Sequence, residues 1–340
     1  MTQAKLLTVI LNWRTPDMTL RAVKAALTAM EGIAGEIVVV DNDSGDGSFE
    51  KMQNHTQAHG WDQNNRVRIL QSGHNGGFGA GNNVGMRAGL SDGTQPDFVY
   101  ILNSDAFPAP DAIRRLIDAL DKDEQLWCAG SYIHGEDGAP HQTLFRFPSV
   151  ASEFEGAIRF GPVSRLLRRH IIALPVPQTN AQADWMAGAS VLMRWNALRE
   201  IGLFDETFFL YFEETDLFLR AHRKGYRSVY VRDSQVMHIG SVSTGMKEWA
   251  RVPDYWFDSR LHYFAKNHGA AYAVAATCVH LLGGGLYWLR RQLDRKPTGM
   301  APHFLRSLLA HDLKSILRAS VGAREPSLAR PVPDAEGKPE

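Results

Sequence analysis

The sequence predicts an α/β protein built on a doubly wound, mostly parallel sheet. Two observations carry this prediction: short apolar segments rich in β-branched residues recur along the first third of the chain, and polar loops and helical patterns lie between them. A strand, a polar loop and a helix repeated in this way give parallel strands joined by right-handed crossovers. The predicted strands cover residues 6–11, 36–40, 66–70 and 98–102.

The first unit opens with the apolar segment LLTVIL, which breaks at Asn12 and the following WRTP. Asp17 or Thr19 can cap a helix that continues to about residue 30. The apolar residues of this helix recur at helical spacing, which predicts that one face packs on the sheet. They are Leu20, Val23, Leu27 and Met30.

The second strand ends in the polar run DNDSGDGS, which starts at Asp41, and a helix follows it. After the third strand comes the glycine-rich stretch GHNGGFGAGNN, residues 73–83, which opens a further helix. This stretch is not a P-loop, because no Lys-Ser or Lys-Thr follows the glycines, and it does not fit the GxGxxG register. It indicates a tight turn or a close backbone approach, with the amides of Asn75, Asn82 and Asn83 available for hydrogen bonds.

The fourth strand stops abruptly in the polar triplet Asn103, Ser104, Asp105. Ligands of open α/β sheets bind beyond the carboxyl ends of the strands, so an acid there can hold a metal or a ligand hydroxyl. An isolated Asp105 would more simply start a turn or cap the helix that begins near Pro110. Polar residues follow each of the other strands as well, and we expect all four sites to converge on one crevice: Asn12, Asp41, Asn75 and Asp105.

The chain becomes less regular after a helix at about residues 111–120. Residues 145–177 are rich in aromatic residues, arginine and proline, and form either an acceptor-facing insertion or a plain surface excursion. Order returns with a strand at 189–193, a short helix at 195–201 and a strand at 228–231.

Three acids, Glu213, Glu214 and Asp216, stand at the start of the helix between these last elements. Acids in a first turn interact favourably with the helix dipole, which is one interpretation of the cluster. The other is a carboxylate at the mouth of the site that acts as a general base. His238, just past the last strand, is either structural or a ligand.

The composition is that of a globular protein. The 340 residues are 44% hydrophobic and 22% charged, and 37 basic residues balance 37 acidic ones, so nothing points to nucleic acid. Cys128 and Cys278 are the two cysteines, with no metal-binding spacing, which argues against a disulfide framework or a zinc site and favours a reducing compartment. The apolar run near the N-terminus is too short for a signal peptide.

The C-terminal part carries one long apolar segment, residues 270–289, with a single ionisable residue, His280. Its glycines make insertion across a bilayer unfavourable, and it ends in Arg290, Arg291, Arg295 and Lys296. A helix lying on an anionic membrane surface and a buried helix with a basic end are both consistent with this pattern. The final segment is rich in Pro, Glu and Lys and is expected to be disordered.

Seven of these stretches, taken in order, resemble the family 2 glycosyltransferases of the GT-A fold, and in particular their bacterial rhamnosyltransferase-like branch. They are VILNWRTPD, VVVDNDSGDGS, NGGFGAGNNVG, YILNSDAFP, DWMAGASVLMR, IGLFDETFFLYFEETDLFLRAHRKGY and VMHIGSVS. The resemblance implies a Rossmann-like GT-A catalytic domain over residues 1–245, with a nucleotide-sugar half at 1–105 and an acceptor half at 106–245. A helical extension at 246–322, which is the candidate for membrane association, and a disordered tail at 323–340 would follow.

The resemblance also implies roles for individual residues. Those that would contact the nucleotide sugar are Asn12, Thr15, Asp41, Asn75, Gly76, Asn82, Asn103 and Asp105. A divalent cation, Mg²⁺ or Mn²⁺, would bind Asp105 in the DxD-like triplet, with His238 as a second ligand. Trp185 and Gly188 would help to form the acceptor side.

The family's usual Glu-Asp pair is Glu213-Glu214 in this chain. We expect Glu214 to be the catalytic base, with Glu213 as the competing candidate and Asp216 fixing the start of the helix.

The leading hypothesis is therefore an inverting hexosyltransferase that moves a sugar from a nucleoside diphosphate donor, with dTDP-L-rhamnose favoured, to a cell-surface glycan or a lipid-linked saccharide. A UDP-sugar donor and a non-catalytic glycan- or nucleotide-binding module are the alternatives. We expect a cytoplasmic protein and no nucleic-acid partner. Peripheral contact with the inner face of the cytoplasmic membrane and a homodimer are left open.

Overall fold

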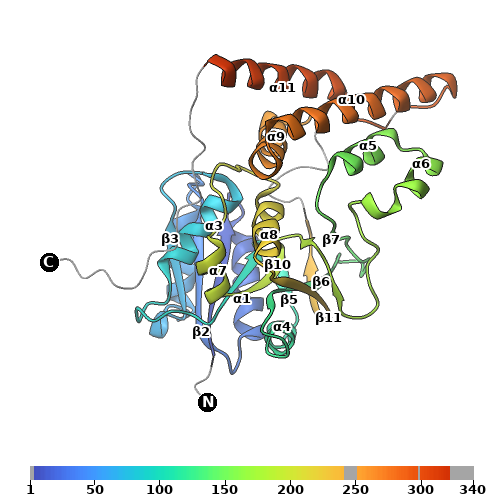
Figure 1. Ribbon diagram of the computed structural model, residues 1–340. Coiled ribbons are helices and arrows are strands. Elements are labelled where there is room, and N and C mark those ends of the chain that lie inside the picture. The colour runs from blue at the N-terminus through green and yellow to red at the C-terminus, as the bar shows by residue number, and fades with distance from the viewer. Residues whose placement is uncertain (1–3, 241–250, 298, 322–340) are drawn as a thin grey trace.

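The computed structural model describes residues 4–240, 251–297 and 299–321. A central sheet lies between two layers of helices, and three C-terminal helices cross one end of it (Figure 1). The expected disordered tail and the residues directly after Gly240 lie outside the described residues. The strands of the main sheet are β1 (Lys5–Asn12), β2 (Ala34–Asp41), β3 (Val67–Gln71), β4 (Phe98–Asn103), β5 (Ala106–Pro108), β6 (Leu126–His134), β8 (Ala181–Gln182), β10 (Ser190–Arg194) and β11 (Arg227–His238).

The order β3-β2-β1-β4 forms a fully parallel half, as the repeated strand–helix pattern predicts. β1, β2 and β4 are buried on both faces, which is why they read as continuous apolar runs, whereas the edge strand β3 is only partly buried. In register, Asn12 stands opposite Asp41, and Leu11 stands opposite Asn103. The polar ends of these strands therefore lie at one level of the same sheet edge.

The other half of the sheet is mixed rather than parallel. β10 runs antiparallel to both β4 and β6, while β11 runs parallel to β6. The difference arises because β10 is entered from the irregular segment before it and not through a helical crossover. β6 was not predicted from the sequence. For β11, the predicted strand ended at the irregularity between Val231 and Gln235, although the strand continues to His238.

Helices cover both faces of the sheet. One core contains side chains of α1, α2 and α4, and the other contains side chains of α3, α7 and α8. These helices are α1 (Pro16–Ala29), α2 (Ser48–Ala58), α3 (Gly77–Ala88), α4 (Ala112–Leu120), α7 (Trp195–Ile201) and α8 (Glu213–Arg223), with a short 3-10 turn η1 (Gln63–Asn65) before β3. All six were expected from sequence periodicity, which fits a layered α/β architecture.

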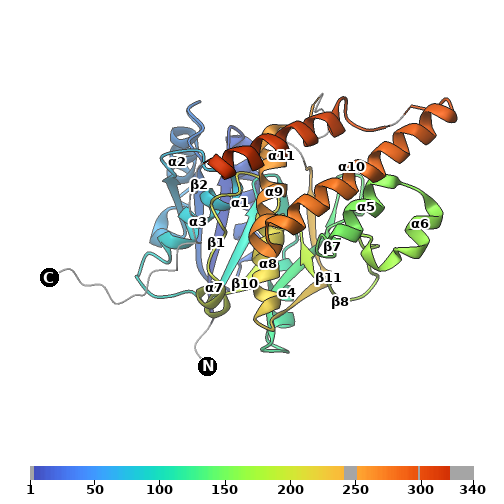
Figure 2. The ribbon, with the colours of Figure 1, turned by 45° about the horizontal axis from the view of Figure 1, so that its top comes forward.

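The segment between β6 and β10 folds beside the C-terminal helices (Figure 2). It contains the two-stranded sheet β7 (Leu144–Phe145) and β9 (Trp185–Met186), with α5 (Val150–Ile158), α6 (Gly161–Leu166) and η2 (Arg168–His170). The C-terminal helices are α9 (Asp254–His268), α10 (Ala270–Leu293) and α11 (Phe304–Val321). Gly283 lets α10 approach α5, since a Cβ there would lie 3.0 Å from the Phe154 carbonyl oxygen.

A network of buried charges holds α9 against α8 and the loop before it. The Lys266 ammonium lies 2.8 Å from the carboxylates of both Asp205 and Asp216, which are 2% and 0% exposed. Burial opposes ionisation of Asp216, but the charges of Arg220 and Lys266 outweigh it and hold the pKa of this carboxyl below its usual value. These ion pairs fix the first turns of α8 to α9.

We expect Lys266→Met to lower the free energy of unfolding by about 3 kcal/mol, because it leaves two buried carboxylates without their shared cation. The midpoint of urea-induced unfolding measures this loss. Lys24→Met, at an exposed position of α1, is the matched control and should leave the midpoint unchanged. An equally small shift for both variants would show that the network contributes nothing to stability.

Candidate active site

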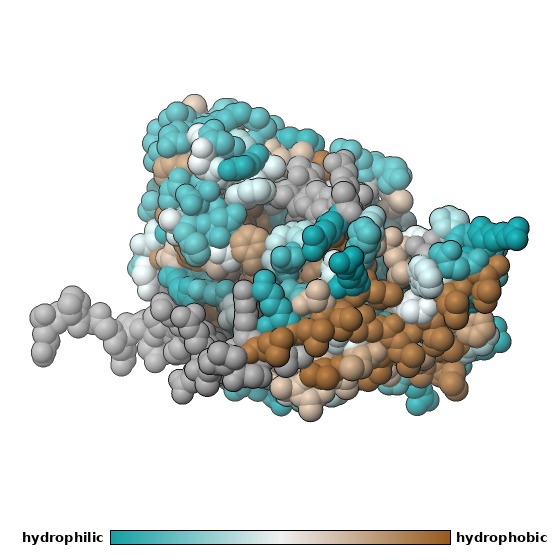
Figure 3. All heavy atoms as spheres, turned by 90° about the horizontal axis from the view of Figure 1, so that it is seen from above, coloured by the Kyte–Doolittle hydropathy of each residue, from teal (hydrophilic) through white to brown (hydrophobic). Residues whose placement is uncertain are grey.

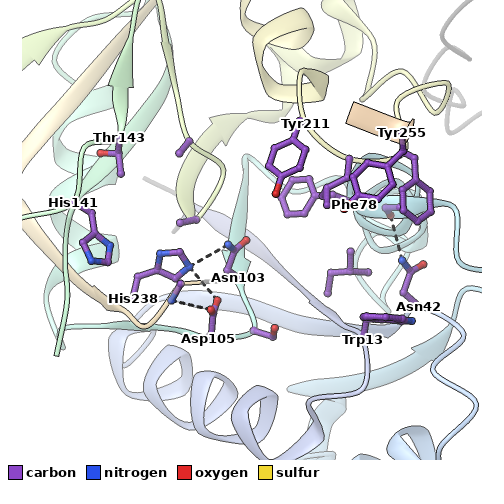
Figure 4. A pocket seen from close by; sticks show the side chains of 18 of the residues that line it. Trp13, Asn42, Phe78, Asn103, Asp105, His141, Thr143, Tyr211, His238 and Tyr255 are labelled. Carbon is purple, nitrogen blue, oxygen red and sulfur yellow. Dashed lines mark hydrogen bonds and ion pairs between the residues drawn. The ribbon is translucent and has the colours of Figure 1, made fainter. Parts of the chain in front are cut away.

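A cavity of about 780 Å³ opens at the carboxyl edge of the sheet (Figure 4). Its floor comes from the ends of β1 and β4 and from the loops after β2 and β3. The loop before α8, the segment after β6 and the start of α9 complete the wall. Among the residues that line the cavity are Trp13, Asn42, Asn75, Phe78, Asn103, Asp105, His141, Phe209, Tyr211, His238 and Tyr255.

An acid and an imidazole meet at one end of this cavity. β5 pairs with β11 so that Ala106 stands opposite His238, and this register brings His238 beside Asp105. The His238 Nε2 atom lies 3.0 Å from Asp105 Oδ1, while Asp105 Oδ2 accepts a hydrogen bond from the Gly240 N–H. Burial raises the pKa of Asp105, but the hydrogen bond and charge of His238 outweigh it and hold the pKa below its usual value. Asp105 is therefore an anion in the cavity wall.

This pair offers a divalent cation one carboxylate oxygen and one imidazole nitrogen, and the cation would replace the hydrogen bond that joins them at 3.0 Å. Carboxylate oxygen and imidazole nitrogen are both accepted by Mn²⁺. The described residues contain no group of three or more acids, histidines or cysteines placed to hold a metal. A cation at this pair would therefore need most of its ligands from a bound molecule or from water.

Aromatic rings and amides gather at the other end, as the positions of Trp13, Asn42, Phe78 and Tyr255 in Figure 4 show. Tyr211 and Tyr255 stack with ring centroids 6.5 Å apart. The Asn42 side chain donates hydrogen bonds to Asn75 Oδ1 and to the Gly77 carbonyl oxygen. This end can therefore hold a flat ring system and offer it polar contacts.

The glycine-rich loop reaches the site through a close backbone approach, as its composition indicates. Gly77 has φ +88°, and a Cβ there would lie 1.7 Å from the Phe209 carbonyl oxygen. The Phe78 N–H donates a 3.0 Å hydrogen bond to the same oxygen. Only glycine fits at this position, so the start of α3 is joined to the loop before α8.

The Glu213-Glu214 pair lies behind the wall at the start of α8. Tyr211 and Phe212 enter this helix with left-handed φ of 70° and 69°, a strained conformation that is frequent at functional sites. Glu214 Oε1 accepts a 3.1 Å hydrogen bond from the N–H of Gly188. The neighbours of Gly188, which are Ala187 and Ala189, line the cavity.

The two carboxyls differ in their surroundings. Glu213 is 2% exposed, and its Oε2 has no hydrogen-bond partner among the described residues. Burial and the neighbouring Glu214 raise the pKa of Glu213 well above its ordinary value. Burial also raises the pKa of Glu214, although backbone N–H groups, including that of Gly188, oppose the rise. The pair is thus able to hold one proton on Glu213 and leave Glu214 ionised and free to accept another.

Comparisons with known proteins show the family to which the chain belongs. The family model for glycosyl transferase family 2 matches residues 8–173, and that for glycosyl transferase family group 2 matches residues 98–293, more than half of the chain. The chain belongs to the family 2 glycosyltransferases. The rhamnosyltransferase-like resemblance of its motifs is confirmed by relatives with that activity in their names.

The N-acetylglucosaminyl-diphospho-decaprenol L-rhamnosyltransferase of Mycobacterium tuberculosis is 30% identical over 53% of this chain and 61% of its own length. The rhamnosyltransferase WbbL of Escherichia coli is 25% identical over 48% and 60%. These matches therefore span about three fifths of each relative. The low-salt glycan biosynthesis hexosyltransferase Agl10 of Haloferax volcanii is 25% identical over 88% of this chain and 89% of its own length.

Solved structures confirm the GT-A fold. GalNAc-T7 with UDP, GalNAc and Mn²⁺ has a TM-score of 0.55 at 14% identity, and covers 94% of this chain and 58% of its own. The mannosyltransferase PcManGT from Pyrobaculum calidifontis, in complex with GDP-Man and Mn²⁺, has a TM-score of 0.51 at 13% identity, and covers 94% and 88%.

Several residues predicted for the donor site of this glycosyltransferase lie behind the cavity wall. Asn12 and Asp41 are buried and bonded to each other at 2.7 Å, and Ser44 donates to the same carboxylate at 2.6 Å. The hydrogen bonds of Asn12 and Asp41 hold the loops after β1 and β2. These two residues therefore position Trp13 and Asn42 but do not line the cavity. Three other predicted donor residues are also absent from the wall: Thr15, Gly76 and Asn82.

Two further predicted site residues, Asp216 and Trp185, do not line the cavity. Asp216 is fully buried in the network with Arg220 and Lys266, which agrees with a role in fixing the start of α8. Trp185 stacks on Phe145 at 4.3 Å, and its indole N–H donates to the Arg146 carbonyl oxygen, outside the wall. By contrast, Asn75, Asn103, Asp105 and His238 all line the cavity.

The sequence analysis missed most of the aromatic wall. Trp13 and Asn42 are direct neighbours of predicted residues, and Phe78 lies within the glycine-rich stretch, so adjacency was a usable signal. Tyr255 comes from α9, which was assigned to a separate extension, and His141 comes from an irregular segment. No local pattern in the sequence indicates that these last two residues reach the site.

Proposed function

We propose that this family 2 glycosyltransferase is an inverting enzyme that transfers a hexosyl group from a nucleoside diphosphate sugar to an acceptor hydroxyl. The observation that carries the proposal is one cavity with two features. Its wall holds the Asp105–His238 pair, and the segment around Gly188 in the same wall is hydrogen-bonded to Glu214 of the Glu213-Glu214 pair. An ion site for a diphosphate and a base for a hydroxyl are the two requirements of this reaction.

The two ends of the cavity suggest how the donor is bound. The nucleobase would lie among Trp13, Phe78 and Tyr255. The diphosphate would extend toward Asp105 and His238. A divalent cation held there would neutralise the diphosphate as charge develops on the leaving group, in agreement with the Mn²⁺ bound in both structural neighbours.

The chain's own residues would then move the proton. As the acceptor oxygen bonds to the anomeric carbon, the bond from that carbon to the diphosphate oxygen breaks, and the nucleoside diphosphate leaves with the bonding electrons. Glu214 takes the acceptor's hydroxyl proton. The N–H of Gly188 orients the Glu214 carboxylate, and the protonated Glu213 beside it avoids a second buried negative charge. A single displacement of this kind inverts the anomeric configuration.

The names of the relatives favour transfer of a rhamnosyl group, for which dTDP-L-rhamnose is our first candidate donor, and one of them favours a lipid-linked saccharide as acceptor. A UDP-sugar with the same chemistry is the second candidate, because GalNAc-T7 was solved with UDP. The test is transfer to N-acetylglucosaminyl-diphospho-prenol from dTDP-L-rhamnose, UDP-GlcNAc and UDP-galactofuranose, with the product's anomeric configuration read by NMR. Retention of configuration would contradict the single displacement, and nucleotide binding with no transfer or donor hydrolysis would favour a non-catalytic binding module.

Tyr255 gives a test of the nucleobase end. Tyr255→Ala should weaken nucleotide binding about tenfold, because loss of one aromatic stacking surface typically costs about 1–3 kcal/mol. Tyr255→Phe keeps the ring and is the matched control, with an expected change of less than about threefold. Calorimetric titration with dTDP and UDP measures both. Unchanged affinity in the alanine variant would place the base elsewhere in the cavity.

A further inference from the structure

The C-terminal helices present an unusual surface. Of the 12 large hydrophobic side chains that are exposed in the described residues, nine lie on α10 and α11, and the others are Phe160, Leu166 and Phe209. We call the nine the outer apolar face. Its members are Val274, Leu282, Leu286, Trp288, Leu289 and Leu293 on α10, with Leu309, Leu313 and Leu317 on α11. Figure 3 shows a continuous hydrophobic band over these helices.

The spacing of these residues shows that the exposure is built into both helices. At the spacing of an α-helix the six residues of α10 lie on one broad face, and those of α11 recur every four residues, so each helix has one exposed apolar stripe. The opposite side of α10 is buried and consists largely of small residues, including Ala273, Ala276, Gly283 and Gly284. A surface helix in water has the reverse arrangement, with polar residues outward. Apolar patches of this extent mark an interaction surface.

α10 is also the one helix of the described chain that is long and apolar enough to cross a membrane, and 33% of its apolar 18-residue stretch is buried. Its inner side, however, is tied to the protein by polar contacts. Arg260, 1% exposed, is bonded to Glu153 and to Thr277 of α10, and His280 of α10 contacts the same Glu153 carboxylate at 2.8 Å. A crossing helix would have to break these bonds and place His280 in hydrocarbon. The arrangement therefore favours a helix that lies along a surface.

Cations flank the outer apolar face. Residues 290–296 carry four basic residues and one acid, Asp294, and both Arg295 and Lys296 are exposed. The neighbouring segment adds exposed basic side chains at Arg165, Arg168 and Arg169. This segment is joined to α10 because Arg290 donates to the Arg159 carbonyl oxygen and lies 4.9 Å from the Phe160 ring centroid. Leucines bordered by arginines complement the acyl boundary and the headgroups of an anionic bilayer.

We propose that the outer apolar face is a membrane-docking surface, on which α10 and α11 lie in the plane of an anionic lipid bilayer. The leucines and Trp288 enter the headgroup–acyl boundary, and the flanking arginines contact anionic headgroups. This binding does not depend on the proposed catalysis.

The docking surface is one helix away from the cavity. On α9, Trp256 and Phe257 pack on Phe304 at the start of α11, while Tyr255 lines the cavity. Docking would therefore hold the cavity close to the bilayer surface, where a lipid-linked saccharide presents its hydroxyl. This consequence, unlike the docking itself, rests on the proposed function.

The test is co-sedimentation of the full chain with vesicles of phosphatidylcholine alone and of phosphatidylcholine with phosphatidylglycerol. We expect binding to the mixed vesicles that is at least about tenfold tighter than binding to the neutral ones. The triple variant Leu282→Gln/Leu289→Gln/Leu293→Gln, at positions 58%, 51% and 76% exposed, should lose at least about tenfold in affinity for the mixed vesicles. Nucleotide binding by this variant should stay unchanged, which shows that it is folded.

A charge variant separates the contribution of the arginines. Arg295→Gln/Lys296→Gln should weaken binding to the mixed vesicles about tenfold and leave binding to neutral vesicles unchanged. Lys24→Gln/Lys122→Gln, which removes two exposed cations elsewhere, is the matched control and should bind like the wild type. Two outcomes would overturn the proposal: no binding to either vesicle, or a dimer in light scattering that the leucine variant converts to a monomer while vesicle binding is unaffected. The second would assign the face to a second copy of the chain.

Discussion

The Glu214→Gln variant is expected to turn over about 100 to 10,000 times more slowly than the wild-type chain, because that is the usual contribution of a positioned general base. Glutamine still has an Oε1 that can accept the 3.1 Å hydrogen bond from the Gly188 N–H, so the wall should keep its shape. It cannot take a proton from the acceptor hydroxyl. The measurement is kcat at saturating donor and acceptor, together with calorimetric titration of the nucleotide, whose affinity should not change.

Glu213→Gln is the matched control. Burial and the neighbouring Glu214 already favour the protonated form of Glu213, so a neutral amide there should lower kcat by less than about tenfold. A larger loss of kcat in this variant than in Glu214→Gln would show that Glu213, and not Glu214, is the base.

The same pair predicts two pH effects. Because burial raises the pKa of Glu214, the wild-type rate should rise with pH through a value above that of an ordinary glutamate. The raised pKa of Glu213 means that its contribution to stability is complete below the pKa of the unfolded chain and is lost as the pH rises. Glu213→Gln should therefore raise the melting temperature at pH 7 and change it little at pH 4.

The second large effect is expected at Asp105. In the Asp105→Asn variant, metal-dependent binding of dTDP or UDP should be lost, and kcat/KM should fall by about 100- to 1000-fold, since a cation on the diphosphate supplies several kcal/mol of charge stabilisation. The amide retains one oxygen but no charge beside His238 Nε2, which lies 3.0 Å from Oδ1 in the wild type. Calorimetric titration of both nucleotides, with and without Mn²⁺, measures the loss.

Asp118→Asn, on the exposed side of α4, is the matched control and should bind nucleotide like the wild type. Binding by the wild type that is equally tight with and without Mn²⁺ would contradict the ion site at Asp105 and His238. It would leave the aromatic end of the cavity as the main source of donor affinity.

Local sequence patterns were sufficient for the parallel half of the sheet. β1, β2 and β4 are buried on both faces, so each is a continuous apolar run, and the crossover helix α1 has one apolar stripe. Of the four strand-end residues expected to converge on one crevice, Asn75 and Asp105 line the cavity, because parallel strands place their carboxyl ends at one edge. Asn103 lines it as well, whereas Asn12 and Asp41 are buried behind its wall.

The mixed half of the sheet required the tertiary structure. β6 and β10 are joined through the irregular segment and α5. No local sequence pattern indicates that β10 inserts antiparallel between β4 and β6. The C-terminal helices likewise join the catalytic half through long-range ion pairs such as that of Lys266 with Asp216, and so α9 brings Tyr255 to the cavity.

The sequence by itself therefore determined the fold class, the family and the edge of the sheet that carries the site. Only the tertiary structure decided which polar side chains face the cavity. Asn12, Asp41 and Asp216 have the residue types of site residues, but hydrogen bonds and ion pairs to other parts of the chain bury them behind its wall. The physical reason is that strand and helix patterns are set by neighbours along the chain, whereas the partner that satisfies a buried polar group is chosen by packing between distant segments.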